Sequence, residues 1–161
     1  MGEDMVKEKT MTANEKQVGG SHYKNTTDMQ HWDFIELYGL GYLEGYSTKY
    51  LVRWRQKGGL QDLQKAEHIV IKLLELHEKY GRTNRSPIIN EEACRAWCET
   101  QKMKVEDQVA FTCICAWRKN VDLRSAILLI RELQREATAR PIDKTGQNHP
   151  FGFDPNEEEG R

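Results

Sequence analysis

The sequence LQDLQKAEHIVIKLLELHEKYG, residues 60–81, has the repeat of side chains that an amphipathic helix requires. Apolar and aromatic side chains recur at intervals of three and four residues, which places them on one face of a helix. They are Leu63, Ala66, Val70, Leu73, His77 and Tyr80. Gly81 follows as a natural stop, because glycine readily adopts the left-handed conformation at a helix end. We therefore expect one long helix over residues 60–80.

Helical periodicity also dominates the rest of the central sequence, and no run alternates as a strand would. Gly58 and Gly59 are expected to end the second helix, and Asn90 to cap the fourth. Glu91 and Glu92 follow that cap, where the helix dipole favours acids. The expected helices cover residues 31–38, 42–57, 60–80, a segment that starts after Asn90, 104–119 and 122–139. The predicted fold class is all-α, a compact bundle of about six helices.

The two ends of the chain differ from this centre in composition. Residues 1–20 are polar and end in two glycines, so we expect a flexible arm. Pro141 is expected to stop the last helix, and residues 141–161 read as a disordered acidic tail. Between these ends we expect a first helical domain over residues 21–81, a linker over 82–89 and a second helical segment over 90–140.

The second helical segment is a candidate degenerate repeat of the first. The segment 31–55 can be aligned without gaps on 94–118, and after a shorter loop the match continues with Asp62 on Asp122. Matched pairs include Glu36 with Glu99, Phe34 with Trp97, Leu51 with Ile114, Trp54 with Trp117, Arg55 with Arg118, Asp62 with Asp122 and Val70 with Ile130. Two three-helix repeats explain this pattern, but amphipathic helices also match one another by chance.

Composition and charge limit the classes of function. The net charge of −1 over 161 residues gives no electrostatic case for a dedicated nucleic-acid binder. No apolar run approaches the roughly 18 residues of a membrane span, and the first residues lack the apolar core of a signal peptide. The sequence thus predicts a protein of the cytoplasm without membrane contact. Its four cysteines should be reduced there.

The segment GLGYLEGYSTKYLVRWRQKGG, residues 39–59, contains glycines and cations but does not have the spacing of a phosphate-binding loop. We expect a turn followed by a helix in which Gly45, Lys49 and Arg53 form one column. Gly45 would leave a notch, Lys49 would supply a mobile charge and Arg53 a planar fork for phosphate oxygens. Lys57 and Lys65 would widen this positive site. The alternative is close helix packing at the glycine beside a solvated basic face.

The candidate second copy lacks this column. Its matching residues are Gln108, Thr112 and Ala116, although the apolar frame persists. The first half is therefore expected to carry the chemistry, and the second half to pack or assemble.

Three further residues could join the site. His22 titrates near neutral pH, and Tyr23 can stack on a base or donate a hydrogen bond. Asp62 lies at the start of the third helix, where a capping role is the default interpretation. In an active site the same carboxylate could bind Mg²⁺ through water, or orient Lys65 or Arg53.

The segments GGSHYK, WDFIE, GLGYLEG, TKYLVR and KGGLQDLQKAEH occur in this order between Gly19 and His68. Together they resemble a family of small phage proteins that carry the SaV-like domain of unknown function, often labelled phage nucleotide kinase. The resemblance is confined to this part of the chain. The matching positions are His22, Tyr23, Lys49, Tyr50, Arg53, Asp62 and Lys65. Two positions depart from the family pattern, which has Asn where this chain has Tyr46 and Tyr where it has Ile69.

The resemblance implies phosphoryl transfer from a nucleoside triphosphate to a (deoxy)nucleoside monophosphate, in the cytoplasm of a host bacterium. Lys49, Arg53 and Asp62 are then the expected catalytic residues, with Mg²⁺ as cofactor. The expected substrate-binding residues are His22, Tyr23, Gly45, Tyr46, Lys49, Tyr50, Arg53, Lys57 and Lys65. A homo-oligomer could build the site between subunits.

Other functions use the same residues differently. A non-catalytic module could bind or sequester a nucleotide, for instance against a host defence, without a metal-binding carboxylate. A protein-interaction factor could inhibit a host enzyme without a small-molecule site.

A helical pyrophosphohydrolase would need clustered acids for Mg²⁺, whereas Glu36 and Glu44 are isolated. No zinc is expected: Cys94 and Cys98 share a helix face, but Cys113 and Cys115 point in different directions, so buried thiols are the better interpretation.

Overall fold

The computed structural model describes residues 29–139, and every regular element in that range is a helix. The helices are α1 (His31–Leu37), α2 (Tyr42–Arg53), α3 (Gly59–Tyr80), α4 (Glu91–Thr100), α5 (Val105–Cys115) and α6 (Asn120–Ala139). The all-α prediction is confirmed. The predicted arm, residues 1–20, and tail, residues 141–161, lie outside the described residues.

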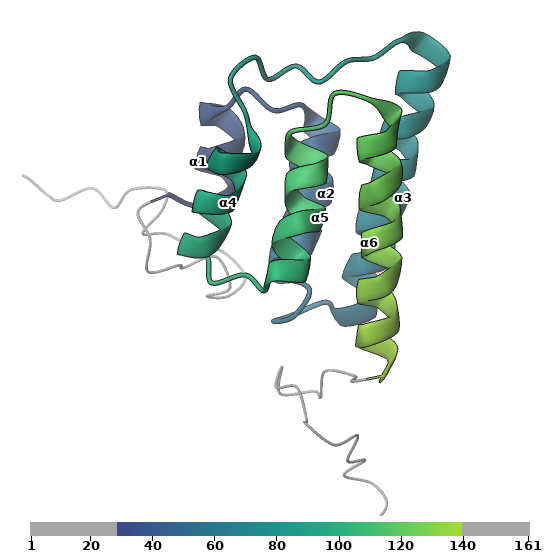
Figure 1. Cartoon of the computed structure of the whole chain (residues 1–161). Coiled ribbons are helices and arrows are strands. Elements are labelled where there is room, and N and C mark those ends of the chain that lie inside the picture. Colours follow the sequence, from purple (N-terminus) through teal and green to yellow (C-terminus); the bar gives the residue numbers. More distant parts are fainter. Residues whose placement is uncertain (1–28, 140–161) are drawn as a thin grey trace, which may run out of the picture.

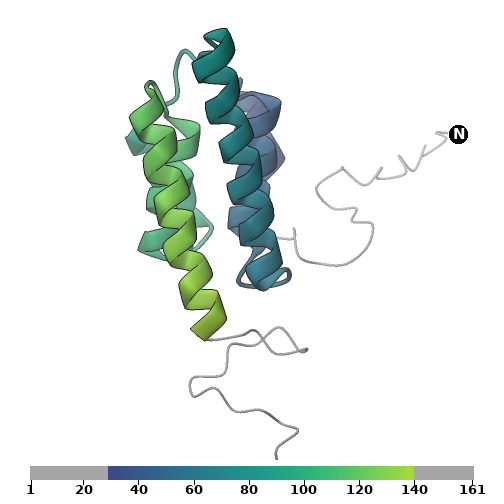
Figure 2. The same cartoon turned by 90° about the vertical axis from the view of Figure 1, so that its right-hand side faces the viewer.

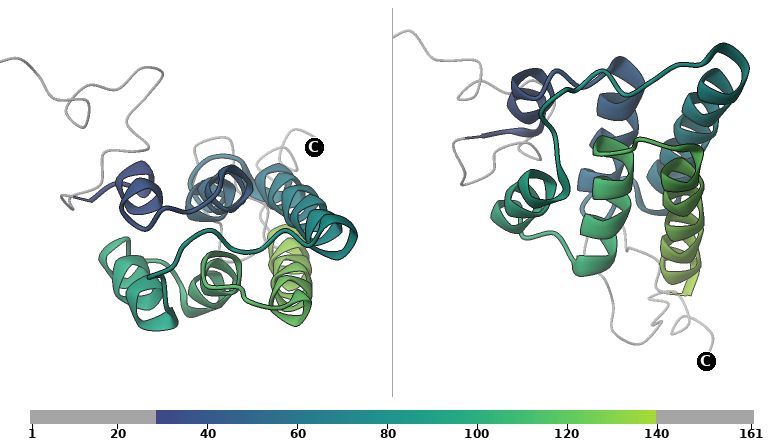
Figure 3. Two further views of the ribbon diagram at one scale, coloured as in Figure 1. Left: turned by 90° about the horizontal axis from the view of Figure 1, so that it is seen from above. Right: turned by 45° about the horizontal axis from the view of Figure 1, so that its top comes forward.

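The helices form two layers of three (Figures 1 and 3). Seen from above, α1, α2 and α3 make one row, and α4, α5 and α6 make the other beneath it. Each helix runs opposite to its counterpart. In the α3–α6 pair, which Figure 2 shows side by side, Glu67 in the first half of α3 bonds Arg131 in the second half of α6, and Glu78 near the end of α3 bonds Arg124 early in α6. The two layers are therefore related by an approximate twofold axis.

The core lies between the layers. Most of the apolar face predicted for the long helix is buried, with Leu63, Ala66, Val70 and Leu73 all at 0% exposure. At its end, His77 is only partly buried and Tyr80 is 69% exposed. Burying one such leucine contributes about 1.5–3 kcal/mol to folding. This main cluster joins α2, α3, α5 and α6, while a second cluster around Phe34, Trp97 and Phe111 joins α1, α4 and α5. Each cluster thus joins helices of both halves.

Two predicted helix ends are wrong, and the local backbone structure explains both. The second helix ends at Arg53 instead of residue 57, because residues 54–58 form a turn that leads directly into α3. Gly59 has a φ of 49°, in the left-handed region that favours glycine. The fifth helix ends at Cys115 instead of residue 119. There the backbone N–H groups of Arg118 and Lys119 donate to the Asp122 carboxylate, so the chain turns into α6.

A pair of buried carboxylates crosses between the layers in a reciprocal way. The Trp117 indole N–H, at the end of α5, donates to Glu44 in α2 at 2.9 Å. The Trp54 indole N–H, at the end of α2, donates to Asp107 in α5 at 3.1 Å. The repeat alignment that places Trp54 on Trp117 also places Glu44 on Asp107. The structure therefore supports the interpretation of two degenerate three-helix repeats.

An arginine binds the carboxylate of each tryptophan–carboxylate pair, and the two arginines come from different segments of the chain. Arg82 donates to both oxygens of Glu44, at 2.7 and 2.8 Å, from the segment after α3. Gly41 leaves the room for this pair, since a Cβ at this position would lie 2.4 Å from the Arg82 guanidinium. Arg55 donates to Asp107 and also to Glu136 of α6. The segment predicted as a linker is thus held against the helices.

Candidate functional site

The predicted basic column lies on the outer face of α2, where the structure divides it between two neighbours. Gly45 faces α1, and a Cβ added there would lie 3.0 Å from Cγ2 of Ile35. Burial lowers the pKa of His31 in α1, and the nearby charge of Lys49 lowers it further, to about 4. The glycine therefore serves close helix packing, as the alternative interpretation of the sequence proposed.

Arg53 turns the other way, towards α3, and forms a two-point ion pair with Asp62. Its Nε lies 2.7 Å from Oδ2 and its Nη2 lies 3.0 Å from Oδ1. Asp62 is almost completely buried and packs on Gly58, where a Cβ would overlap its carboxylate. The residues of the KGG turn, Arg53 and Asp62 thus form one structural unit that closes the connection between α2 and α3.

An open pocket of about 360 Å³ lies next to this ion pair, between α2 and α3. Its lining includes three predicted substrate-binding residues, Tyr46, Tyr50 and Lys65. We call it the tyrosine pocket; the other lining residues are Gln61, Gln64, His68 and Ile69. Tyr46 and Ile69, the two departures from the family pattern, therefore lie in the same pocket. Ligand pockets commonly measure roughly 300–1,000 Å³, so the volume suits a small ligand.

The pocket combines aromatic rings with positive charge. Tyr46 and Tyr50 have ring centroids 5.2 Å apart, and the Tyr50 hydroxyl donates to that of Tyr46 at 3.0 Å. This hydrogen bond, with burial, raises the pKa of Tyr50 to about 12. The Arg53 guanidinium and Lys65 ammonium lie 4.8 and 5.4 Å from the centre of the Tyr50 ring. Such a surface can stack a planar base and attract an anion.

The remaining predicted residues are not brought into the pocket lining. Lys57 lies exposed in the turn before α3. Tyr42, which was not a predicted site residue, stacks on Tyr46 with ring centroids 5.4 Å apart. His22 and Tyr23 lie outside the described residues. Gln61, Gln64 and His68 line the pocket but were not predicted from the sequence. Their spacing of three and four residues along the predicted third helix, on the side of Lys65, was the available signal.

The equivalent surface of the second half has a different chemistry. Under the repeat relation, Tyr46, Tyr50, Lys65 and His68 correspond to Val109, Cys113, Ser125 and Leu128. Val109 and Leu128 are 44% and 61% exposed. The counterpart of the tyrosine pocket thus offers neither tyrosine rings nor a lysine for a charged aromatic ligand.

The cysteines lie mainly in the interior, as free thiols. Cys94, Cys98 and Cys115 are fully buried, while Cys113 is partly exposed. Burial raises the pKa of Cys98 and of Cys115, which keeps both protonated and poorly nucleophilic. Within residues 29–139, no three His, Cys, Asp or Glu side chains are placed to hold a metal ion.

These features define a two-layer, six-helix protein with an aromatic and basic pocket on one of its two related halves. Comparisons with protein-family models, curated proteins and solved structures find no significant match. The resemblance to phage nucleotide kinases therefore stays a prediction. None of the helices between residues 29 and 139 has the length and apolar character to cross a membrane.

Proposed function

We propose that the tyrosine pocket binds a (deoxy)nucleoside monophosphate, and that the chain is a phage nucleotide-binding protein of the kind its sequence resembles. The observation that carries this proposal is the convergence of Tyr46, Tyr50 and Lys65, from two helices, around one pocket beside Arg53. A base would stack on the tyrosine rings, a contact that contributes about 1–3 kcal/mol per base. The phosphate would lie towards Lys65 and the outer edge of Arg53.

The Arg53–Asp62 pair favours binding over phosphoryl transfer. Both carboxylate oxygens of Asp62 accept hydrogen bonds from Arg53, and the carboxylate is buried. It is well placed to orient the guanidinium but has little room for a Mg²⁺ ion. Binding without turnover is therefore our first proposal.

Phosphoryl transfer is the second candidate, and one observation favours it. Lys49 and Arg53 are one turn apart along α2, a spacing at which two cations can neutralise a transferring phosphoryl group. If the protein is a kinase, Mg²⁺ would bridge the donor phosphates. Asp62 could then act only through a water molecule or after release of Arg53.

Binding is best tested by calorimetric titration of each nucleoside and deoxynucleoside monophosphate into the wild-type protein and the Tyr46→Ala and Lys65→Ala variants. We expect each substitution to weaken binding about tenfold, because stacking or a charge-assisted contact is lost. Val109→Ala and Ser125→Ala are the matched controls in the second half, and we expect both to bind normally. Equal binding by all five proteins would place the ligand elsewhere.

Turnover needs a separate assay. The protein is incubated with ATP, Mg²⁺ and each monophosphate, and the products are resolved by ion-exchange chromatography. Nucleoside diphosphate that disappears in Lys49→Ala would establish the kinase. Binding without diphosphate would establish the non-catalytic module. Arg53→Lys is preferable to Arg53→Ala, because removal of the whole guanidinium leaves Asp62 buried without its partner.

A further inference from the structure

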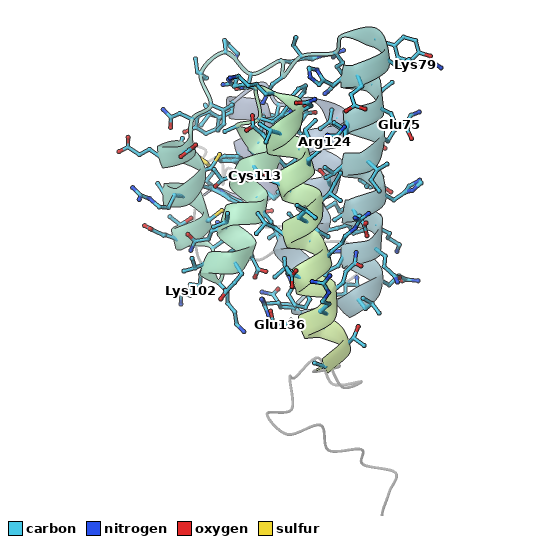
Figure 4. All side chains as sticks on the ribbon, turned by 45° about the vertical axis from the view of Figure 1, so that its right-hand side comes forward. Glu75, Lys79, Lys102, Cys113, Arg124 and Glu136 are labelled. Atoms are coloured by element: carbon cyan, nitrogen blue, oxygen red, sulfur yellow. The ribbon has the colours of Figure 1, made fainter. Side chains whose placement is uncertain are left out.

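A second and larger pocket lies on the neighbouring face of α3, against α6. Its volume is about 750 Å³, and we call it the α3–α6 pocket. The residues that matter are Leu60, Gln64 and Glu67 of α3 and Arg131, Gln134 and Arg135 of α6. It lies towards the lower end of the pair in Figure 4, the end of α6 that carries Glu136, and away from Arg124 and Glu75.

The polar groups of this pocket suit an oxyanion. Two guanidinium groups and two side-chain amides come together there. Arg131 pairs with Glu67 at 2.6 Å, Gln134 donates to the other oxygen of Glu67 at 2.7 Å, and Arg135 pairs with Glu132. Arg131 and Arg135 are 49% and 71% exposed. The exposed Arg135–Glu132 pair contributes little to stability, so a multiply charged phosphate can compete for Arg135. It can also approach the exposed side of Arg131, whose partner Glu67 is 17% exposed.

The two pockets adjoin on α3, because Gln64 lines both of them. A ligand with its base among the tyrosines can therefore extend its phosphates over Gln64 towards Arg131.

The opposite end of the α3–α6 pair lacks these groups. Under the repeat relation Arg131 and Gln134 correspond to Ile71 and Leu74, which are apolar. Arg124, which corresponds to Gln64, is paired with Glu78. The arginine cluster of the α3–α6 pocket is thus a feature of one end only and does not follow from the repeat.

We infer that the α3–α6 pocket is a polyphosphate subsite, with Arg131 and Arg135 as its binding residues. It rests on the proposed function where it extends to nucleotides: a nucleoside triphosphate would occupy both pockets, and a monophosphate only the tyrosine pocket. The second half of the chain then has a role in recognition, because α6 supplies both arginines.

The pocket is tested on its own with inorganic tripolyphosphate as the probe, by calorimetric titration of the full chain. We expect the wild type to bind, and the double variant Arg131→Ala/Arg135→Ala to bind at least tenfold more weakly. The control Arg95→Ala/Arg124→Ala removes the same charge from two other exposed, ion-paired arginines and should bind within twofold of the wild type. Absence of wild-type binding, or an equal loss in both double variants, would overturn the inference.

The extension to nucleotides uses ATP and AMP as the ligands. We expect the wild type to prefer ATP over AMP about tenfold, and Arg131→Ala/Arg135→Ala to lose this preference while AMP binding persists. An unchanged preference in that variant would overturn the shared site. If AMP and ATP both fail to bind but tripolyphosphate still binds through Arg131 and Arg135, the proposed function fails and the polyphosphate subsite stands.

Discussion

The two halves of the molecule have the same frame and different outer surfaces. On the inside, each half gives a tryptophan and a carboxylate to the other, through Trp54 with Asp107 and Trp117 with Glu44. At the tyrosine pocket, Tyr46, Lys65 and the buried Tyr50 are replaced by valine, serine and cysteine on α5 and α6. A frame that tolerates both surfaces does not require the tyrosines and the lysine, which is why we assign them to ligand binding.

The two buried carboxylates differ in their arginine partners, and this difference allows the test with the largest expected effect on stability. Glu44 is fully buried, and Arg82 donates to both of its oxygens. Asp107 shares Arg55 with Glu136, so that arginine has a second carboxylate. Removing the carboxylate should therefore have different consequences in the two halves.

We expect Glu44→Ala to lower the free energy of unfolding by about 3–5 kcal/mol, because it leaves a buried guanidinium and the Trp117 indole without their acceptor. Asp107→Ala should cost less, about 1–3 kcal/mol, since Arg55 keeps Glu136. Urea unfolding followed by circular dichroism measures both. Equal losses would show that Glu136 does not compensate, and a greater loss for Asp107→Ala would contradict the account.

The next effect concerns His31, whose counterpart in the second half is Cys94. Burial, then the charge of Lys49, lowers the pKa of His31 from 6.5 to about 4. The unfolded chain therefore takes up this proton first, so the stabilising contribution is full above pH 6.5 and is lost as the pH falls towards 4. We expect the free energy of unfolding to fall by about 2 kcal/mol between pH 7 and pH 5.

The control for this pH effect is His31→Gln, which keeps a polar group near the Thr48 hydroxyl, 2.9 Å from Nε2 in the wild type. Its stability should change much less over the same interval, as measured by urea unfolding at each pH. A slope identical to that of the wild type would show that other groups cause the change.

The smallest expected effect is that of Gly45→Ala. The new methyl group would meet Ile35 at 3.0 Å, which costs stability, while alanine is favoured over glycine in a helix by about 1 kcal/mol. The two terms oppose each other, so we expect stability to change by less than about 1 kcal/mol and nucleotide affinity to stay within twofold. Thermal unfolding measures the stability, and calorimetric titration measures the nucleotide affinity. A tenfold loss of nucleotide affinity would show that Gly45 belongs to the binding site.

The sequence predicted the fold well, because the apolar period of residues such as Leu63, Val70 and Leu73 is a local signal. It predicted the membership of the site less well. The spacing of Gly45, Lys49 and Arg53 shows that they share a helix face, but not that α1 covers the glycine and Asp62 holds the arginine. These contacts depend on tertiary packing, which spacing along one helix does not report.

The role of Glu44 was missed for a similar reason. Its partners Arg82 and Trp117 lie far along the chain, beyond the end of α3 and at the end of α5, so no local pattern connects them. The repeat alignment matches Glu44 to Asp107 and Trp54 to Trp117, and could have indicated that these residues play equivalent roles. A paired carboxylate and tryptophan in both copies is a pattern that a reader of the sequence can look for.

The most direct test of the central claim is a two-dimensional ¹H–¹⁵N NMR titration of the full chain with a deoxynucleoside monophosphate. Signals from both related surfaces are followed together, so each half serves as the control for the other. We predict that the amide signals of Tyr46, Tyr50 and Lys65 shift in a saturable way while those of Val109, Cys113 and Ser125 stay in place. Shifts centred on the second half, or no saturable shift at either surface, would contradict the assignment of nucleotide binding to the first half.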